Sequence, residues 1–393
     1  MKKYFNQLLY NPFFIKCIII IYLLNTTFSF GFTSLKLSYF IFFISILLVT
    51  KSDIKIFLNH SKSILLTIPF VFIFIIFAYL NNHNIFNFLK IFLFFLSFIL
   101  ISSVFKKYLS LKLVVEIIIL ASFINSTIIL LEFFYDPLKV FLENILIQYS
   151  DNNISYANSI FRLRGIALGS GASLGLFNLI AMILLINNGL NKLNYYDFIK
   201  ISIIFLSCFF ISRSSIYVGF ILYSIFLFIQ FKNKPINFLF FFSLFLFVFI
   251  LLFQNILAQQ LDYSWFFWVF STFETFIEFN VFEFSNSSVT DLSETTSFNV
   301  NNFILGNGYY SGPSDFLIQS DSGYWRMTNA IGMGSVLFYS YFIFNAIKIN
   351  FNHKFINYLL ILILLVFEIK EPFLIQNYSA RALLLIFIFS YRK

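Results

Sequence analysis

The chain has 393 residues, of which 60% are hydrophobic and only 11% are charged, and its mean hydropathy is +0.88. A soluble domain of this size has about 25% charged residues, so the composition excludes an ordinary water-soluble enzyme. The formal net charge of +9 does not indicate nucleic-acid binding, because most Lys and Arg residues stand in short connections between apolar segments.

Twelve apolar segments are candidate transmembrane helices. They cover about residues 12–31, 36–50, 64–81, 86–104, 113–134, 165–187, 199–213, 215–231, 236–254, 327–347, 355–369 and 375–391. Backbone groups in lipid must be hydrogen-bonded within the protein, and none of the segments alternates as a barrel strand does, so we expect helices. The predicted fold class is all-α, a polytopic integral membrane protein with about 12 transmembrane helices.

The positions of the charges predict the orientation of the chain. Every connection on the N-terminal side of the membrane contains basic residues, namely Lys2, Lys3, Lys51, Lys55, Lys62, Lys106, Lys107, Lys112, Lys192, Lys200, Lys232, Lys234, Lys348, Lys354, Arg392 and Lys393. Of the 17 acidic residues, only Asp53 and Asp197 lie in these connections. Because basic residues remain on the cytoplasmic side, we expect both termini to be cytoplasmic.

The lengths of the connections predict three regions. Residues 1–253 hold transmembrane helices 1–9, with a smaller outer segment at 136–164. Residues 254–326 form one large outer loop, and residues 327–393 hold transmembrane helices 10–12. Since the chain has most of its extramembrane residues on the outer face, we expect its chemistry there.

Five arginines are expected at or near the outer ends of the spans, against the usual charge bias. They are Arg162, Arg164, Arg213, Arg326 and Arg381. Arg presents a planar fork that suits bidentate contact with phosphate, so a group of them favours a diphosphate site. The alternative for each is anchoring to lipid phosphates or pairing with outer carboxylates.

Glycine and hydroxyl residues accompany the first three of these arginines. Arg213 stands in a tight outer turn at 209–215, between Ser212 and Ser214, whose hydroxyls can donate to an anion or satisfy the turn itself. Small residues four apart follow Arg164, in the pairs Gly165 with Gly169 and Gly171 with Gly175. This spacing predicts close helix packing, while exposed amides facing a phosphate are the alternative.

The end of the large loop holds a third group of polar and aromatic residues. A turn-rich stretch at 306–310 contains Tyr309, and residues 320–326 contain Asp321, Tyr324 and Arg326. The Asp321 carboxylate can accept a proton from an attacking sugar hydroxyl, or it can cap a following helix. The rings of Tyr309 and Tyr324 are candidates for stacking against sugars.

Several kinds of site are missing from the sequence. The three histidines, His60, His83 and His353, lie outside the large loop, and Cys17 and Cys208 are far apart within apolar segments. No nucleotide-binding or metal-binding motif is present, so we expect no cofactor and no metal. Any transfer reaction must therefore use a donor that is already activated.

At residues 162–175, 209–215 and 306–334 the sequence resembles the Wzy-type O-antigen and capsule polymerases, within the wider O-antigen polymerase and ligase superfamily. The resemblance implies a GT-C-like membrane glycosyltransferase of lipopolysaccharide or capsule biosynthesis. Such an enzyme joins undecaprenyl-diphosphate-linked oligosaccharide repeat units at the periplasmic face of a bacterial inner membrane, without metal or nucleotide.

The resemblance also implies roles and partners. Arg213, with Arg162 or Arg164 and Arg326, would stabilise the departing diphosphate, and Asp321 would orient or deprotonate the acceptor hydroxyl. Membrane lipids, a chain-length regulator and a flippase are the other expected partners, and no nucleic acid is expected. An O-antigen ligase is one alternative, although ligases use a His where this chain has Asp321. A lipid-linked oligosaccharide flippase or transporter is another, although the span interiors hold few charges.

Overall fold

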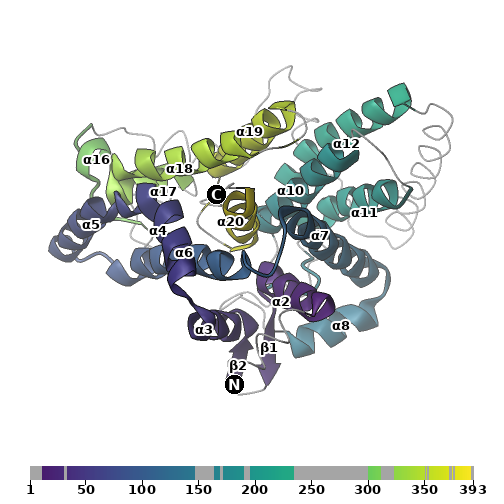
Figure 1. Ribbon diagram of the computed structural model, residues 1–393, viewed down its shortest axis with the longest axis horizontal. Coiled ribbons are helices and arrows are strands. Elements are labelled where there is room, and N and C mark those ends of the chain that lie inside the picture. Colours follow the sequence, from purple (N-terminus) through teal and green to yellow (C-terminus); the bar gives the residue numbers. More distant parts are fainter. Residues whose placement is uncertain are drawn as a thin grey trace. The chain divides into compact units, whose positions relative to one another are not determined.

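The computed structural model describes residues 11–30, 33–146, 163–168, 171–189, 195–233, 300–310, 323–349, 351, 354–370, 374 and 377–390. These residues are mainly α-helical, with one two-stranded antiparallel hairpin (Figure 1). The chain divides into two compact units. Unit 1 consists of Met1–Ala121, Ile145–Ile147 and Thr290–Lys393, and unit 2 of Ser122–Asn144 and Gln148–Val289.

Unit 1 contains the hairpin and most of the described helices. Its strands are β1 (Thr27–Phe30) and β2 (Thr33–Lys36), which pair from Thr27 opposite Lys36 to Phe30 opposite Thr33. Its helices are α2 (Pro12–Leu24), α3 (Leu37–Leu48), α4 (Lys51–Leu65), α5 (Ile68–Leu80), α6 (Ile85–Phe105), α16 (Val300–Leu305), α17 (Gly323–Ile331), α18 (Gly334–Lys348), α19 (Lys354–Lys370) and α20 (Asn377–Ser390). A further helix, α7 (Leu111–Phe134), begins in unit 1 and ends in unit 2.

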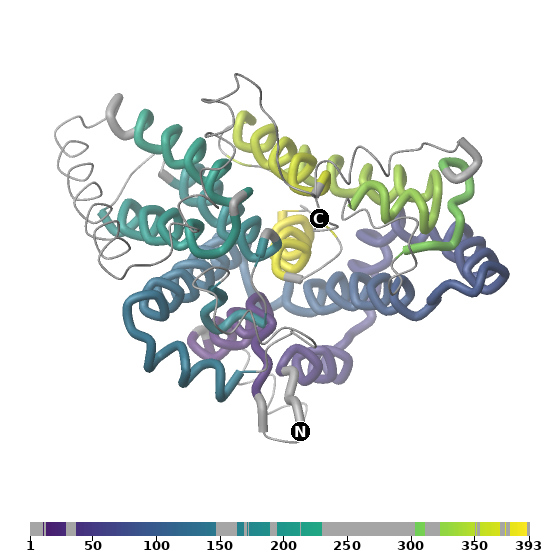
Figure 2. The backbone as a smooth tube through the Cα atoms, turned by 180° about the vertical axis from the view of Figure 1, so that it is seen from behind, coloured from purple at the N-terminus to yellow at the C-terminus, as the bar shows by residue number. Residues whose placement is uncertain are grey.

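Helix α6 lies at the centre of unit 1, in contact with α3, α4, α5 and α20. Figure 2 shows the yellow α20 beside the blue α6. The ring of Phe95 is fully buried, 5.2 Å from that of Phe338 and 5.7 Å from that of Phe342, measured between centroids. Within a membrane, burial from water no longer drives helices together, so such close contacts provide much of the stability.

Unit 2 is built from helices that share a buried polar network. It contains the end of α7, with α8 (Asp136–Ile145), α10 (Ala172–Gly189), α11 (Tyr195–Ile211) and α12 (Arg213–Asn233), and α10, α11 and α12 pack against one another. The amide of Asn178 on α10 donates to Ser207 Oγ on α11 at 3.0 Å and to Ser126 Oγ on α7 at 3.2 Å. It also accepts from Ser122 Oγ at 2.9 Å. Satisfied polar side chains of this kind fix the register of apolar helices.

The apolar character of the helices suggests a membrane protein. Among the described helices, α6 and α7 are long and apolar enough to cross a membrane, and α4 with α5 is a third candidate if this pair, bent by 54°, forms one span. Helices α2, α3, α10, α12 and α20 are apolar but shorter. The predicted helical fold is thus confirmed in outline, while the number of 12 spans stays a prediction.

Some helix boundaries differ from the sequence prediction, for local reasons. The helix expected over 12–31 ends at Leu24, because Asn25 takes the left-handed conformation, with φ 49°, before β1. The span expected over 327–347 is divided between α17 and α18 at Gly332, which has φ +51°. Helix α4 occupies an expected connection, and the span expected at 236–254 lies outside the described residues.

The N-terminal end of α6 lies near the residues that follow α16. The Asn81 side-chain amide donates to the Asn307 carbonyl at 3.2 Å. The rings of His83 and Tyr309 meet edge to face, with 5.3 Å between their centroids. These four residues belong to connections that the charge pattern places on the outer side.

The C-terminal end of α6 lies near other helix ends. Lys106 Nζ donates to the Ile388 carbonyl, near the end of α20, at 2.6 Å. Lys107 Nζ donates to the Leu48 carbonyl, at the end of α3, at 3.0 Å, and forms an ion pair of 3.1 Å with Asp53. Lysines here satisfy the terminal carbonyls of neighbouring helices. The charge pattern places the three charged residues on the inner side, and Leu48 and Ile388 near the inner ends of their predicted spans.

Candidate functional site

The structure describes five of the eight candidate site residues with their side chains. Arg164 belongs to unit 2, and Tyr309, Tyr324, Arg326 and Arg381 belong to unit 1. Arg162 and Asp321 lie outside the described residues, as does the side chain of Arg213. The predicted roles of these last three therefore stay predictions.

The turn that carries Arg164 is bound to α7 by hydrogen bonds from two side chains. Asn125 Nδ2 donates to the Arg164 carbonyl at 3.1 Å, and Asn125 Oδ1 accepts from the Ile166 amide at 2.9 Å. The Glu132 carboxylate accepts from the Gly165 amide at 3.0 Å. Asn125 and Glu132 are both buried. The backbone at Arg164 is thus fixed on both sides before any ligand arrives.

The same turn also contacts the end of α11. The Leu163 amide donates to the Phe210 carbonyl at 2.9 Å. Phe210 lies three residues before Arg213, the first residue of α12. Two of the arginine-bearing segments that the sequence analysis selected are therefore neighbours in unit 2.

The α11–α12 turn is stabilised by its own hydroxyl groups. Ser215 Oγ donates to the Ser212 carbonyl at 2.7 Å, and Ser212 Oγ donates to Ser215 Oγ at 2.9 Å. On α10, a Cβ added at Gly175 would stand 2.6 Å from the Cβ of Ser215, so the glycine permits close contact with α12. Close packing at Gly175 is confirmed. Gly165 and Gly171, however, have φ +62° and +89° and precede the first residue of α10, and no atom lies within 4 Å of a Cβ added at Gly171. Helix packing is therefore the wrong explanation for these two, and Gly169 lies outside the described residues.

The stretch at 306–310 packs tightly within unit 1, as its glycines allow. A Cβ at Gly306 would stand 2.6 Å from the Ala330 carbonyl oxygen, and one at Gly308 would stand 2.3 Å from the backbone nitrogen of Ala78. The backbone N–H of Asn307 donates to the backbone carbonyl of Asn329 at 2.7 Å. These contacts join residues 306–310 to α17 and to α5.

Tyr324 is directed toward α19. Its hydroxyl donates to the Leu365 carbonyl at 3.0 Å, and its ring lies 4.8 Å from that of Tyr339. Burial, and then the nearby charge of Glu368, raise the pKa of Tyr324, so its hydroxyl remains a donor. The neighbouring Arg326 side chain is half-buried on α17. Stacking of Tyr309 or Tyr324 on a sugar stays a prediction.

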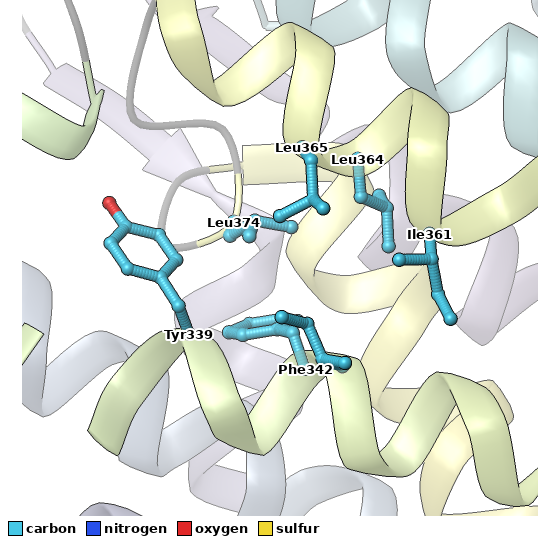
Figure 3. Close-up of a pocket in the computed structure, with 7 residues that line it drawn as sticks. Tyr339, Phe342, Ile361, Leu364, Leu365 and Leu374 are labelled. Atoms are coloured by element: carbon cyan, nitrogen blue, oxygen red, sulfur yellow. The ribbon is translucent and has the colours of Figure 1, made fainter. Parts of the chain in front are cut away.

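Glu368 is a fully buried carboxylate that the sequence analysis did not select. It accepts from the Tyr339 hydroxyl at 3.0 Å and from the Leu374 amide at 3.0 Å. Next to it is a small apolar pocket, and Figure 3 shows Tyr339 and Leu374 at its edge. The signal that could have found Glu368 is a single acid near the end of a long apolar segment.

Arg381 has a structural role that the sequence did not reveal. Its side chain is buried, and Nη2 donates to Asn25 Oδ1 at 2.9 Å while Nη1 donates to the Tyr22 carbonyl. Its guanidinium also lies over the rings of Tyr22 and Phe98, at 5.0 and 4.6 Å from their centroids. Arg381 therefore closes the end of α2, and diphosphate binding by it stays a prediction.

The described residues contain no cluster of three or more His, Cys, Asp or Glu side chains placed to hold a metal ion. In unit 2, hydrogen bonds fix the backbone at Arg164, which has a cationic side chain. This residue lies beside the turn where α12 begins with a second arginine, Arg213. Comparison of the chain with protein-family models, curated proteins and solved structures finds no match.

Proposed function

We propose that this protein polymerises undecaprenyl-diphosphate-linked oligosaccharide repeat units into O-antigen or capsular polysaccharide, at the periplasmic face of a bacterial inner membrane. The observation that carries the proposal is the contact between the Arg164 turn and the end of α11, next to Arg213, at 2.9 Å between Leu163 N and Phe210 O. Two arginines carried by neighbouring backbone segments suit a diphosphate better than a single phosphate.

The contacts at the two ends of α6 support the predicted division of the connections between two sides of a membrane. Residues that the charge pattern places outside are in contact at one end, as with Asn81 and Asn307. Residues that it places inside are in contact at the other, as with Lys106 and Ile388. Because α6 is 21 residues long, its ends are about 31 Å apart, close to the thickness of the hydrocarbon core.

The proposed reaction needs neither metal nor nucleotide. A hydroxyl of one lipid-linked repeat unit attacks the anomeric carbon of the growing chain, which is linked to a second lipid diphosphate. The new glycosidic bond forms as the bond between that carbon and the diphosphate oxygen breaks. Arg213 with Arg162 or Arg164 stabilises the charge on the leaving diphosphate. Arg326 for the same role, and Asp321 as acceptor of the hydroxyl proton, stay candidates from the sequence.

The experiment that tests this function is deletion of the gene, followed by gel analysis of the cell-surface polysaccharide. We expect the ladder of long chains to disappear while single repeat units still reach the surface. If single units also vanish, flipping or ligation explains the protein better. An unchanged ladder would contradict the proposal for that polysaccharide.

Complementation with variants tests the arginines. We expect Arg213→Ala and Arg164→Ala to leave mostly single units at normal protein levels, since each removes a donor to the leaving group. Arg392→Ala is the matched control, because Arg392 is expected on the opposite side of the membrane. Normal chain length with Arg213→Ala would exclude its diphosphate role.

A further inference from the structure

Three successive backbone groups, in Arg164, Gly165 and Ile166, are bound by only two side chains of α7. We propose that these side chains, Asn125 and Glu132, are positioning residues that hold Arg164 ready for the diphosphate of the lipid-linked substrate. This inference rests on the function proposed above. It assigns a role to two residues that the sequence analysis did not select.

The spacing of the two side chains suits this role. Asn125 and Glu132 are seven residues apart, about two turns of helix, so both lie on one face of α7. Asn125 is 0% exposed and Glu132 4%. The Asn125 amide reaches both sides of the turn, while Glu132 reaches its middle.

The turn itself is shaped for this contact. Gly165 has φ +62°, and a Cβ added there would stand 2.6 Å from Asn125 Oδ1. Only glycine fits such a conformation at such a distance. Leu163 and Ala167 on either side are buried and anchor the turn in unit 2.

Packing alone does not explain why residue 132 is a glutamate. A buried carboxylate is costly within a membrane protein, and a glutamine could accept the same hydrogen bond from Gly165. A carboxylate differs from a glutamine in that it can carry a negative charge next to the turn of Arg164, in addition to its hydrogen bond to the backbone.

A fixed Arg164 loses less conformational freedom when the substrate binds, so loosening it should weaken substrate binding. We expect Asn125→Leu to raise the KM for the lipid-linked repeat unit about tenfold, the scale of one lost charge-assisted contact. We expect kcat to change less. Glu132→Gln should give an intermediate KM, because the hydrogen bond to Gly165 is kept and only the charge is removed.

The experiment combines kinetics with hydrogen exchange on the full-length protein in detergent. Exchange at the amides of Gly165 and Ile166 is measured for wild type, Asn125→Leu, Glu132→Leu and Glu132→Gln. The KM is measured for the same proteins, and the Kd for the lipid-linked repeat unit is measured with and without Arg164→Ala, a background in which little polymerisation is expected. Glu116→Gln is the matched control, because Glu116 is an exposed acid on the same helix.

The expected result is faster exchange in Asn125→Leu and Glu132→Leu, with slow exchange kept in Glu132→Gln. Both leucine variants should also weaken binding of the repeat unit, and their effect on the Kd should disappear in the Arg164→Ala background, because Asn125 and Glu132 act on the substrate only through Arg164. Faster exchange with an unchanged KM would overturn the positioning role and leave the polymerase proposal intact. Absence of polymerisation by the wild type would instead overturn the proposed function and this inference with it.

Discussion

Arg381 and Asn25, which are 356 positions apart in the chain, are joined by a hydrogen bond of 2.9 Å from the guanidinium Nη2 to the amide oxygen. The contact links the first turns of α20 to the residue that ends α2. Asn25 needs a partner there because it is buried in a left-handed conformation. An Arg that the sequence suggested for a ligand is thus part of the internal structure of unit 1.

Replacing Arg381 should destabilise the protein. Arg381→Leu removes the donor of Asn25 Oδ1 and leaves the Tyr22 carbonyl with only the Asn25 backbone N–H, so we expect a loss of about 2–4 kcal/mol in the free energy of unfolding. Arg381→Lys keeps the charge but cannot reach both acceptors with the same fork, so its loss should be smaller. Thermal unfolding in detergent measures both, with Arg392→Leu as the control. A melting temperature equal to that of the wild type would show that the contact contributes nothing.

Comparison of substitutions at Gly308 and Gly171 should separate the destabilising effect of a steric contact from that of backbone strain. Gly308 and Gly171 both have positive φ, +74° and +89°, but only Gly308 lies against another segment, at Ala78. We therefore expect Gly308→Ala to lower the melting temperature clearly more than Gly171→Ala, which should cost about 1 kcal/mol from strain alone. Similar losses in the two variants would mean that 306–310 does not pack on α5 as described.

The stability of the protein should fall in mildly acidic solution because of His60. Burial, followed by the charges of Lys106 and Lys348, lowers the pKa of His60 from 6.5 to about 4. The unfolded chain therefore binds a proton at His60 at higher pH than the folded protein does. The contribution of the neutral, buried His60 to the free energy of unfolding is complete above pH 6.5 and is lost as the pH falls toward about 4. In His60→Gln the decline over this range should be shallower. Unfolding curves from pH 7 to 4 compare the two proteins, and parallel declines would contradict this role of His60.

Labelling of single cysteines should reveal the predicted orientation. In a background of Cys17→Ser and Cys208→Ser, we expect His83→Cys to react with a membrane-impermeant thiol reagent added to spheroplasts. Lys51→Cys and Lys354→Cys should react only after the membrane is opened, because the charge pattern places them inside. The reverse pattern would invert the whole topology and place the Arg164 turn on the wrong face for periplasmic chemistry.

The sequence predicted the helices well where an apolar segment is bounded by polar residues. Residues 86–104 and 355–369 were expected as spans, and α6 and α19 begin and end within one or two positions of them. The predicted helix ends were wrong where one residue changes the backbone conformation inside an apolar segment, as Asn25 and Gly332 do. Hydropathy does not report such conformations.

The candidate site was predictable only in part. The glycines at 306 and 308 were expected in a turn, and each indeed has positive φ. Asn125, Glu132 and Glu368 had no assigned role, because a single polar residue in an apolar helix does not reveal its partner. Those partners, such as Gly165 for Glu132, come from other segments and emerge only in the folded chain.

The central claim is the polymerisation of lipid-linked repeat units, and reconstitution tests it most directly. The purified protein in liposomes would be given undecaprenyl-diphosphate-linked repeat units of its own host, with a metal chelator and without nucleotide sugars. The account predicts polysaccharide of increasing length, release of undecaprenyl diphosphate, and loss of both in Arg213→Ala but not in Arg392→Ala. Repeat units that stay single in the presence of folded wild-type protein would contradict it.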